Sequence, residues 1–266
     1  SSGSAAAVAD GMVPLALGTQ TAGSLMRPAA YCGVVGFKPS FGGINRAGVK
    51  PLSDTLDTVG TIARNVPDAA LFAAALSGRH AWQVRPLGEH VSRPLRVGLC
   101  QTYEWSHALP ETQAALQHAA ACIQAHPDMV LRDVRLPVDY GQLAQAQTHI
   151  QLAEQAQCLA YERLQHAAQL SPRLQGIVQA GVDVTVAQYD QAQAVVARCR
   201  AQLAAVFQDV DVLLAPSAPG AAPLGLDNTG DPVFCRIWTV LHTPTVNIPA
   251  GFAPNGMPVG LQVVGP

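Results

Sequence analysis

The chain has 266 residues, of which 49% are hydrophobic and only 13% are charged, so it can bury a large core. Its formal net charge is −2 and its 16 Lys and Arg residues form no cluster, which argues against a nucleic-acid partner. No apolar run approaches the roughly 18 residues that a membrane span needs. The first residues lack the basic leader that is typical of a signal peptide.

Small residues dominate the first 28 positions, and they are too small to fill a core. An Ala-rich run after Ser4 favours a helix, and the apolar segments 12–18 and 34–37 predict buried strands. Between these segments lies the run Gly18-Thr19-Gln20-Thr21-Ala22-Gly23-Ser24. It predicts a loop that presents one hydroxyl and several free N–H groups to a ligand. Residues 46–57, rich in Gly, Pro and Asp, predict a surface loop near it.

The middle of the chain predicts a helix, a boundary and a β-α-β unit. Asn65 or Asp68 can cap a helix that ends at Gly78. Residues 79–94 lack periodicity and predict an internal boundary. The unit that follows is expected to have a strand, a helix and a parallel strand at 95–100, 111–125 and 129–136.

The last part predicts helices and then a return to the core. Two long helices are expected at 141–169 and 185–208, with breaks near Ser171-Pro172 and Gly181. We expect them to pack on the sheet and shape the substrate entrance. The remaining elements are strands at 210–215, 245–248 and 259–264 and a helix at 234–241.

A loop of small residues with one serine has two common uses, phosphate binding and oxyanion stabilisation around a nucleophile. The dinucleotide and Walker fingerprints are absent from the sequence, and so is the G-x-S-x-G elbow, because Leu25 and Met26 follow Ser24. The six cysteines are widely spaced, without a C-x-x-C pair, and predict free thiols in a reducing compartment, with no metal site.

The first sixty residues resemble the amidase signature enzymes. The resemblance rests on the Ser/Gly/Ala-rich start, the 18–24 loop followed by Arg27-Pro28, the run 29–40 and Leu56-Asp57-Thr58-Val59-Gly60. It implies an α/β fold with a mixed, mostly parallel central sheet covered by helices on both faces. It also implies one amidase domain over 1–266, truncated at both ends. Within it we expect a signature core at 1–78, a helical and β-α-β segment at 95–208, and a C-terminal return to the core sheet at 209–266.

The resemblance implies a chemical role for the loop. Ser24 falls on the family's nucleophile, and the backbone N–H groups of Thr21, Ala22 and Gly23, with that of Ser24, are the expected oxyanion hole. In the family the serine's proton passes to a serine on a cis peptide and then to an upstream lysine. Ser1 falls on the residue just after that relay serine, so this chain carries the nucleophile without its base.

Two departures from the family pattern concern charge. Gln20 replaces an acidic residue, and Met26 replaces an arginine, with Arg27 one place later. Both charges of an ion pair are lost together, so neither is left buried without a partner. We therefore expect neutral hydrogen bonds from Gln20 to hold the loop, and we expect activity to survive. Gln20 and Arg27 are the residues expected to support the site.

Other candidates keep two interpretations. Asp231 and Trp238 have two interpretations. Both line the substrate pocket, or Asp231 is a turn residue and Trp238 is an aromatic residue of the core. Asp57 satisfies backbone groups in a turn or acts directly in catalysis. Lys38 and Lys50 are the only lysines, and the segment around Lys38 supports the fold in the family. A Ser-His-Asp triad stays open, since such triads assemble from distant positions.

These observations predict a serine amidase that hydrolyses a carboxylic amide to an acid and ammonia or an amine through an acyl-enzyme, without metal or organic cofactor. We expect a small-molecule amide substrate, a cytoplasmic location and a homodimer, with no nucleic acid and no membrane. Three alternatives remain: a protein like the catalytic subunit of an amidotransferase, a hydrolase of allophanate or another urea derivative, and a non-catalytic scaffold.

Overall fold

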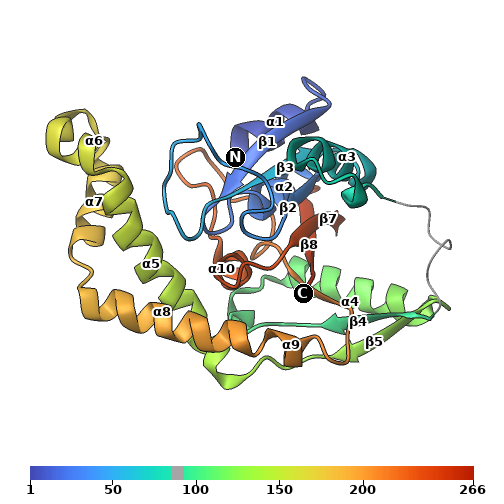
Figure 1. The fold of residues 1–266 in the computed structure, drawn as a ribbon. Coiled ribbons are helices and arrows are strands. Elements are labelled where there is room, and N and C mark those ends of the chain that lie inside the picture. Colours follow the sequence, from blue (N-terminus) through green and yellow to red (C-terminus); the bar gives the residue numbers. More distant parts are fainter. Residues whose placement is uncertain (85–92) are drawn as a thin grey trace.

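The computed structural model describes residues 1–84 and 93–266, which build one eight-stranded sheet (Figure 1). The strands lie in the order β1-β3-β2-β7-β8-β6-β4-β5. In chain order they are β1 (Leu15–Gln20), β2 (Val35–Lys38), β3 (Thr58–Ala63), β4 (Leu95–Leu99), β5 (Met129–Asp133), β6 (Val212–Pro216), β7 (Thr245–Phe252) and β8 (Pro258–Val264).

The sheet is mixed, but the expectation that it is mostly parallel is wrong. Strand β4 pairs in parallel with β5 and β6, whereas all the pairs that join β1, β3, β2, β7, β8 and β6 are antiparallel. Two neighbouring parallel strands need a long crossover connection between them. Only the segment between β4 and β5 shows a clear crossover, a helix, in the sequence. The short connection between β7 and β8 instead makes a hairpin. The predicted parallel β-α-β unit is confirmed, with Leu95 opposite Met129.

The part of the chain that the structure describes forms ten α-helices. They are α1 (Ser2–Ala9), α2 (Met26–Cys32), α3 (Val66–Ser77), α4 (Pro110–Ala125), α5 (Leu143–Cys158), α6 (Ala160–Gln165), α7 (Pro172–Val182), α8 (Val186–Ala201), α9 (Leu203–Val206) and α10 (Val233–Val240) among the described residues. Short 3₁₀ turns are at His80–Trp82, Trp105–His107, Val138–Gln142 and Ala167–Gln169. No helix in the described ranges is both long and apolar enough to cross a membrane.

Local signals explain where several helices begin and end. The Asn65 side chain accepts a hydrogen bond from the N–H of Asp68 at the start of α3, and Gly78 ends the helix with a left-handed φ of 69°, as predicted. The predicted break near Gly181 is confirmed, because α7 ends at Val182 and α8 begins at Val186. A Cβ at Gly181 would clash with the carbonyl oxygen of Leu152, so the glycine allows α7 to pack closely against α5. The predicted boundary at 79–94 lies partly outside the described residues.

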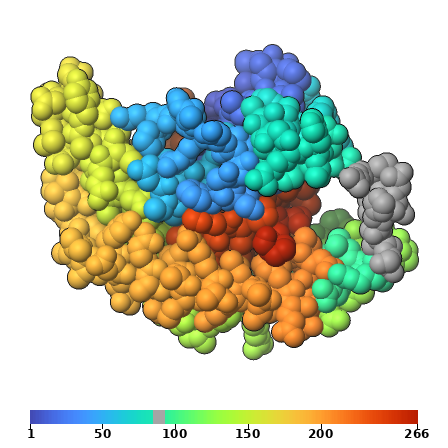
Figure 2. All heavy atoms as spheres, in the orientation of Figure 1, coloured from blue at the N-terminus to red at the C-terminus, as the bar shows by residue number. Residues whose placement is uncertain are grey.

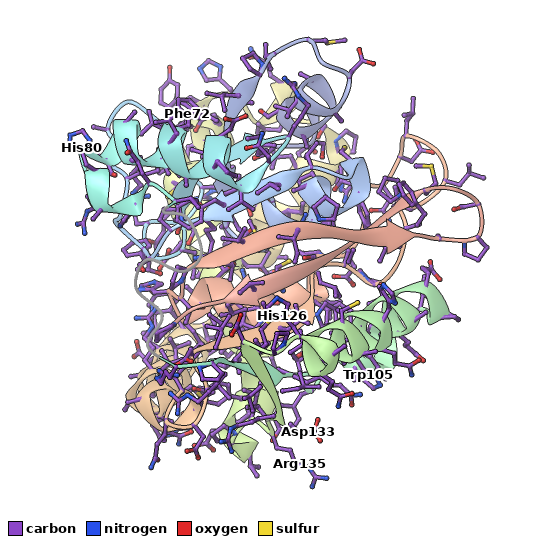
Figure 3. The ribbon with its side chains drawn as sticks, turned by 90° about the vertical axis from the view of Figure 1, so that its right-hand side faces the viewer. Phe72, His80, Trp105, His126, Asp133 and Arg135 are labelled. Carbon is purple, nitrogen blue, oxygen red and sulfur yellow. The ribbon has the colours of Figure 1, made fainter. Side chains whose placement is uncertain are left out.

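Helices cover both faces of the sheet, as expected. On one face Leu213 and Val264 pack with Trp238 of α10 in the largest core cluster. On the other face Leu214 and Leu261 pack with Leu116 of α4. Figure 3 shows Asp133 and Arg135, at the end of β5, pointing away from the sheet, in agreement with their exposure. The division of the chain into three segments stays a prediction.

Helices α5, α6, α7 and α8 form an arm that extends beyond the sheet, with α6 at its far end (Figure 1). Within the arm, α5 packs against both α7 and α8. In Figure 2 the yellow-green surface of the arm lies against the blue segment that leads from β2 toward β3. The arm therefore contacts the loop region between these two strands.

Candidate active site

The loop of residues 21–25 connects the end of β1 to the start of α2. At this end β1 is the outer strand of the sheet, and Ser1 covers its free edge. The Ser1 hydroxyl accepts a hydrogen bond from the N–H of Thr19 at 3.0 Å and donates to the Thr19 carbonyl at 3.1 Å. The start of α1 is thereby fixed beside the last residues of β1.

Gln20 holds the loop closed with neutral hydrogen bonds, as the sequence predicts. Its side chain is fully buried, and its Oε1 accepts from the N–H groups of Leu25 at 3.0 Å and Met26 at 3.1 Å. Its Nε2 donates to the Thr239 hydroxyl of α10 at 2.8 Å. Since the first N–H groups of a helix have no partner within the helix, the Gln20 amide also caps α2.

The carbonyl groups of residues 21–23 all accept hydrogen bonds from the protein. The Thr21 carbonyl accepts from Nε2 of Gln147 at 3.0 Å, and the Ala22 carbonyl accepts from the Thr239 hydroxyl at 2.6 Å. The Gly23 carbonyl accepts from the N–H of Arg27 at 3.0 Å. In contrast, the N–H groups of residues 21–24 have no acceptor among the residues that the structure describes. The loop thus presents four successive donors with fixed carbonyls behind them.

Gly23 is required where α10 begins. A Cβ at this position would lie 2.7 Å from Cβ of Pro232 and 2.9 Å from Cβ of Cys235, which is too close for either contact. The bare backbone therefore lets the loop pack directly on α10. Burial raises the pKa of the Cys235 thiol to about 12, so this neighbour is a neutral packing group.

Ser24 lies two residues before the start of α2 and is half-buried. Within the described ranges its hydroxyl has no hydrogen-bond partner, and neither lysine is bonded to it. Nζ of Lys38 is fully buried and donates to the carbonyls of Pro39 at 3.0 Å and Thr243 at 2.5 Å. Burial lowers the Lys38 pKa to about 7. Lys50 is exposed and pairs with Glu162 at 2.7 Å.

Arg27 follows Ser24 by three residues on α2 and is 8% exposed. Its Nη2 donates to the Thr229 hydroxyl at 3.3 Å, and its Nε has no partner in the described part of the chain. Burial lowers the Arg27 pKa. Asp231 is exposed in the neighbouring loop, whereas Trp238 is fully buried in the core with Leu213.

Asp57 bonds to the loop from the other side. Its Oδ1 accepts from the Thr21 hydroxyl at 2.6 Å, and its Oδ2 accepts from the N–H groups of Leu52 at 2.7 Å and Ser53 at 3.0 Å. Asp57 therefore satisfies backbone groups in a turn, one of its two predicted roles, and also binds the candidate site. Gln147 and Thr239 were missed, because an Ala/Gln-rich helix and a lone threonine carry no signal for a contact with a distant loop.

A comparison with known families gives one decisive match, since the profile described as Amidase matches residues 1–266. The chain belongs to the amidase signature family. A glutamyl-tRNA(Gln) amidotransferase subunit of Thermosynechococcus vestitus is 30% identical to it, over the whole of this chain and 63% of the relative. The 2-amino-5-chloromuconic acid deaminase of Comamonas testosteroni is 32% identical, over the whole chain and 60% of the relative.

Solved structures of the amidase family agree with this assignment. The crystal structure of an amidase is 31% identical and superposes with a TM-score of 0.88, over 99% of this chain and 61% of that one. A glutamyl-tRNA(Gln) amidotransferase subunit of Thermotoga maritima is 26% identical, with a TM-score of 0.80, over 99% of this chain and 61% of that one. The chain thus spans 60–63% of the length of the curated relatives described above.

Proposed function

We propose that the whole protein is a serine amidase in which Ser24 is the nucleophile and the N–H groups of Thr21, Ala22, Gly23 and Ser24 bind the oxyanion. The observation that carries this proposal is the loop geometry: each carbonyl from residue 21 to 23 is bonded, whereas the four N–H groups are free within the described ranges. Donors that are fixed before the reaction stabilise developing negative charge without reorganising.

In the proposed reaction the Ser24 hydroxyl oxygen forms a bond to the amide carbon while a base takes its proton. The carbonyl oxygen becomes an oxyanion that the loop N–H groups bind. Collapse of this intermediate breaks the C–N bond, and the leaving nitrogen takes up the proton and departs as ammonia or an amine. Water then attacks the acyl-enzyme, and the acid is released. A serine needs a base at the first step, and the family pattern supplies it from a lysine and a relay serine upstream of Ser1.

The activity test compares two serine variants of the full-length protein on a panel of carboxylic amides. Ser24→Ala is expected to lose turnover of every amide that the wild type hydrolyses. Ser40→Ala changes an exposed serine outside the loop and serves as the matched control. Equal turnover in wild type and Ser24→Ala would refute the proposal.

A second candidate is an amidotransferase subunit, since relatives with that name share 30% identity with this chain. The run Ser53-Asp54-Thr55-Leu56-Asp57-Thr58 lacks the Ser-Ser-Leu-Asp-Gln-like sequence that we expect in such a protein. Co-purification with a partner subunit would favour this candidate, whereas turnover of free amides by the isolated protein favours the amidase.

The remaining expectations for the whole protein are proposals of the same kind. The cysteines are free thiols in the structure, which fits a reducing compartment such as the cytoplasm. We expect a homodimer, which size-exclusion chromatography with light scattering would test. A substrate panel that includes allophanate and related urea derivatives would separate the amidase from a hydrolase of that type.

A further inference from the structure

We propose that Glu154 of α5 is a positioning residue for the oxyanion-binding loop, acting through the 52–57 turn, Asp57 and Thr21. The inference rests on the proposed function, because it concerns how the Ala22 N–H, which shares a peptide with the Thr21 carbonyl, is held in place. It gives a second residue of α5 a role at the candidate site, beside Gln147, which bonds to the Thr21 carbonyl.

Glu154 is a buried carboxylate that gathers four donors. It is 4% exposed and accepts from the hydroxyl of Ser53, from the N–H of Thr55 at 2.9 Å and from the Thr55 hydroxyl at 2.7 Å. The Tyr189 hydroxyl of α8 donates to it at 2.8 Å. No Lys, Arg or His nitrogen of the described residues lies within 4.0 Å of it. A buried carboxylate without a cation depends on its donors, so Glu154 fixes the turn that supplies three of them.

The same turn is held by a second carboxylate, and one residue bonds to both. The fully buried Ser53 donates its hydroxyl to Glu154 and its N–H to Asp57 at 3.0 Å. Asp57 also accepts from the N–H of Leu52 at 2.7 Å. A shift of Ser53 would therefore displace the donor to Glu154 and the donor to Asp57 together. Because Glu154 holds Ser53 in place, the position of Asp57 depends on Glu154.

Asp57 passes this constraint to the loop. The Thr21 hydroxyl donates to Asp57 at 2.6 Å, while the Thr21 carbonyl accepts from Gln147 at 3.0 Å. Gln147 and Glu154 are seven residues apart on α5, which places them on the same face of the helix. One face of α5 thus holds Thr21 by a direct route through its carbonyl and by an indirect route through its side chain.

This double attachment fixes the orientation of the Ala22 N–H, one of the proposed oxyanion donors. The Ala22 N–H lies in the same planar peptide as the Thr21 carbonyl, so holding both the carbonyl and the side chain of Thr21 leaves this N–H little freedom to turn. A misplacement of about 1 Å in a reacting group can cost about a hundredfold in rate. Loss of the Glu154 carboxylate is therefore expected to slow the reaction of Ser24 by about tenfold to a hundredfold, with little change in the binding of the reagent.

The test measures the reaction of Ser24 with a serine-directed fluorophosphonate in the full-length protein, because phosphonylation uses both the nucleophile and the oxyanion donors. The maximal inactivation rate and the half-saturating concentration are measured separately for wild type, Glu154→Gln, Thr21→Val and the double variant. Glu162→Gln, on α6 of the same arm, is the matched control, since its carboxylate is half-buried and pairs with Lys50.

If Glu154 acts through Thr21, Glu154→Gln lowers the maximal rate by about tenfold or more in the wild-type background and by less than about threefold in the Thr21→Val background. Thr21→Ser keeps the hydroxyl and is expected to restore most of the rate. Should Glu154→Gln not fold, Ser53→Ala takes its place in the same cycle, since it removes the hydroxyl that donates to Glu154 and keeps the N–H that donates to Asp57.

Two results would overturn the positioning role. The first is that the wild type is labelled at Ser24 and that a folded Glu154→Gln variant is labelled at the same rate. The other is a rate loss of the same size in both Thr21 backgrounds, which would show a general structural effect. A wild type that never labels at Ser24 overturns the proposed function as well, so the two failures are distinguishable.

Discussion

Gln20 and Thr239 are 219 residues apart in the chain, yet the Gln20 amide donates to the Thr239 hydroxyl at 2.8 Å. The same hydroxyl donates to the Ala22 carbonyl at 2.6 Å. A residue at the end of β1 and a residue of α10 together fix the Ala22–Gly23 peptide, which carries the Gly23 N–H, one of the proposed oxyanion donors. This relationship joins the two ends of the chain at the candidate site.

Gln20→Ala tests this relationship. The variant leaves the N–H groups of Leu25 and Met26 and the Thr239 hydroxyl without their buried partner. We expect the free energy of unfolding to fall by about 2–4 kcal/mol, because each buried unsatisfied group costs about 1–3 kcal/mol. We also expect turnover to fall by at least about tenfold. Urea unfolding and amide turnover measure the two effects.

The control for Gln20→Ala is Gln113→Ala, because the Gln113 side chain makes one hydrogen bond, to the Ala108 carbonyl, far from the loop in sequence. If Gln20→Ala kept both the wild-type stability and the wild-type turnover, neutral hydrogen bonds from Gln20 would not be what holds the loop.

Gly23→Ala is expected to damage the site through packing. The new Cβ would lie 2.7 Å from Pro232, so the loop must shift away from α10. We expect a loss of about 1–3 kcal/mol in stability and at least about a tenfold loss of Ser24 labelling. The matched change is Gly3→Ala in α1, where nothing lies within 4 Å of the new methyl group. That variant should keep its activity and gain up to about 1 kcal/mol in stability. Equal labelling of the two variants would contradict the packing argument.

Lys38→Met tests whether the buried lysine is the base. Because Nζ of Lys38 donates to the carbonyls of Pro39 and Thr243, we assign it to the fold. The variant is expected to lose stability, since two buried acceptors lose a donor, while the folded fraction labels at Ser24 within about threefold of wild type. Labelling per folded molecule is measured by combining circular dichroism with mass spectrometry. A folded variant that labels about a thousandfold more slowly would identify Lys38 as the base.

His242 predicts a pH dependence of stability. Burial and the Arg200 guanidinium, whose Nη2 lies 2.8 Å from Nε2 of His242, lower the His242 pKa to about 4. The folded state therefore keeps the ring neutral, whereas in the unfolded chain it takes up a proton near pH 6.5. The ring's contribution to stability is complete above about pH 6.5 and is lost as the pH falls toward 4.

The measurement compares the free energy of unfolding at about pH 7.5 and about pH 4.5 in wild type and His242→Asn. Asn tolerates the left-handed backbone at this position, where φ is 66°. The wild type is expected to lose more stability than the variant between the two pH values. Equal losses would mean that the ring does not stay neutral in the folded protein.

The sequence predicted the elements whose signals are local. Asn65 and Gly78 mark the ends of α3 by side-chain capping and a left-handed turn, and both act within four residues. The β-α-β unit follows from the alternation of strand, helix and strand. In contrast, β3 was not predicted, because its six residues are all buried and show no alternation of polar and apolar positions. Helix α2 was also missed, since Pro28 lies in its first turn and its seven residues give little periodicity.

The candidate loop could be found from its residues, but its supports could not. Gln147 and Thr239 reach the loop across 126 and 217 residues, and neither lies in a pattern that specifies a contact. The relative direction of the strands was predicted wrongly for the same reason. The antiparallel pair of β2 and β7, for example, joins segments more than two hundred residues apart. Contacts of this kind depend on the folded arrangement and leave no periodic trace in the sequence.

The nucleophilic role of Ser24 is tested most directly by mapping the site of fluorophosphonate labelling in the full-length protein. Peptide mass spectrometry of the wild type is expected to find the phosphonate on Ser24, and the intact Ser24→Ala variant is expected to gain no mass. Labelling of another residue, or of none, in a folded and active wild type would contradict the role of Ser24.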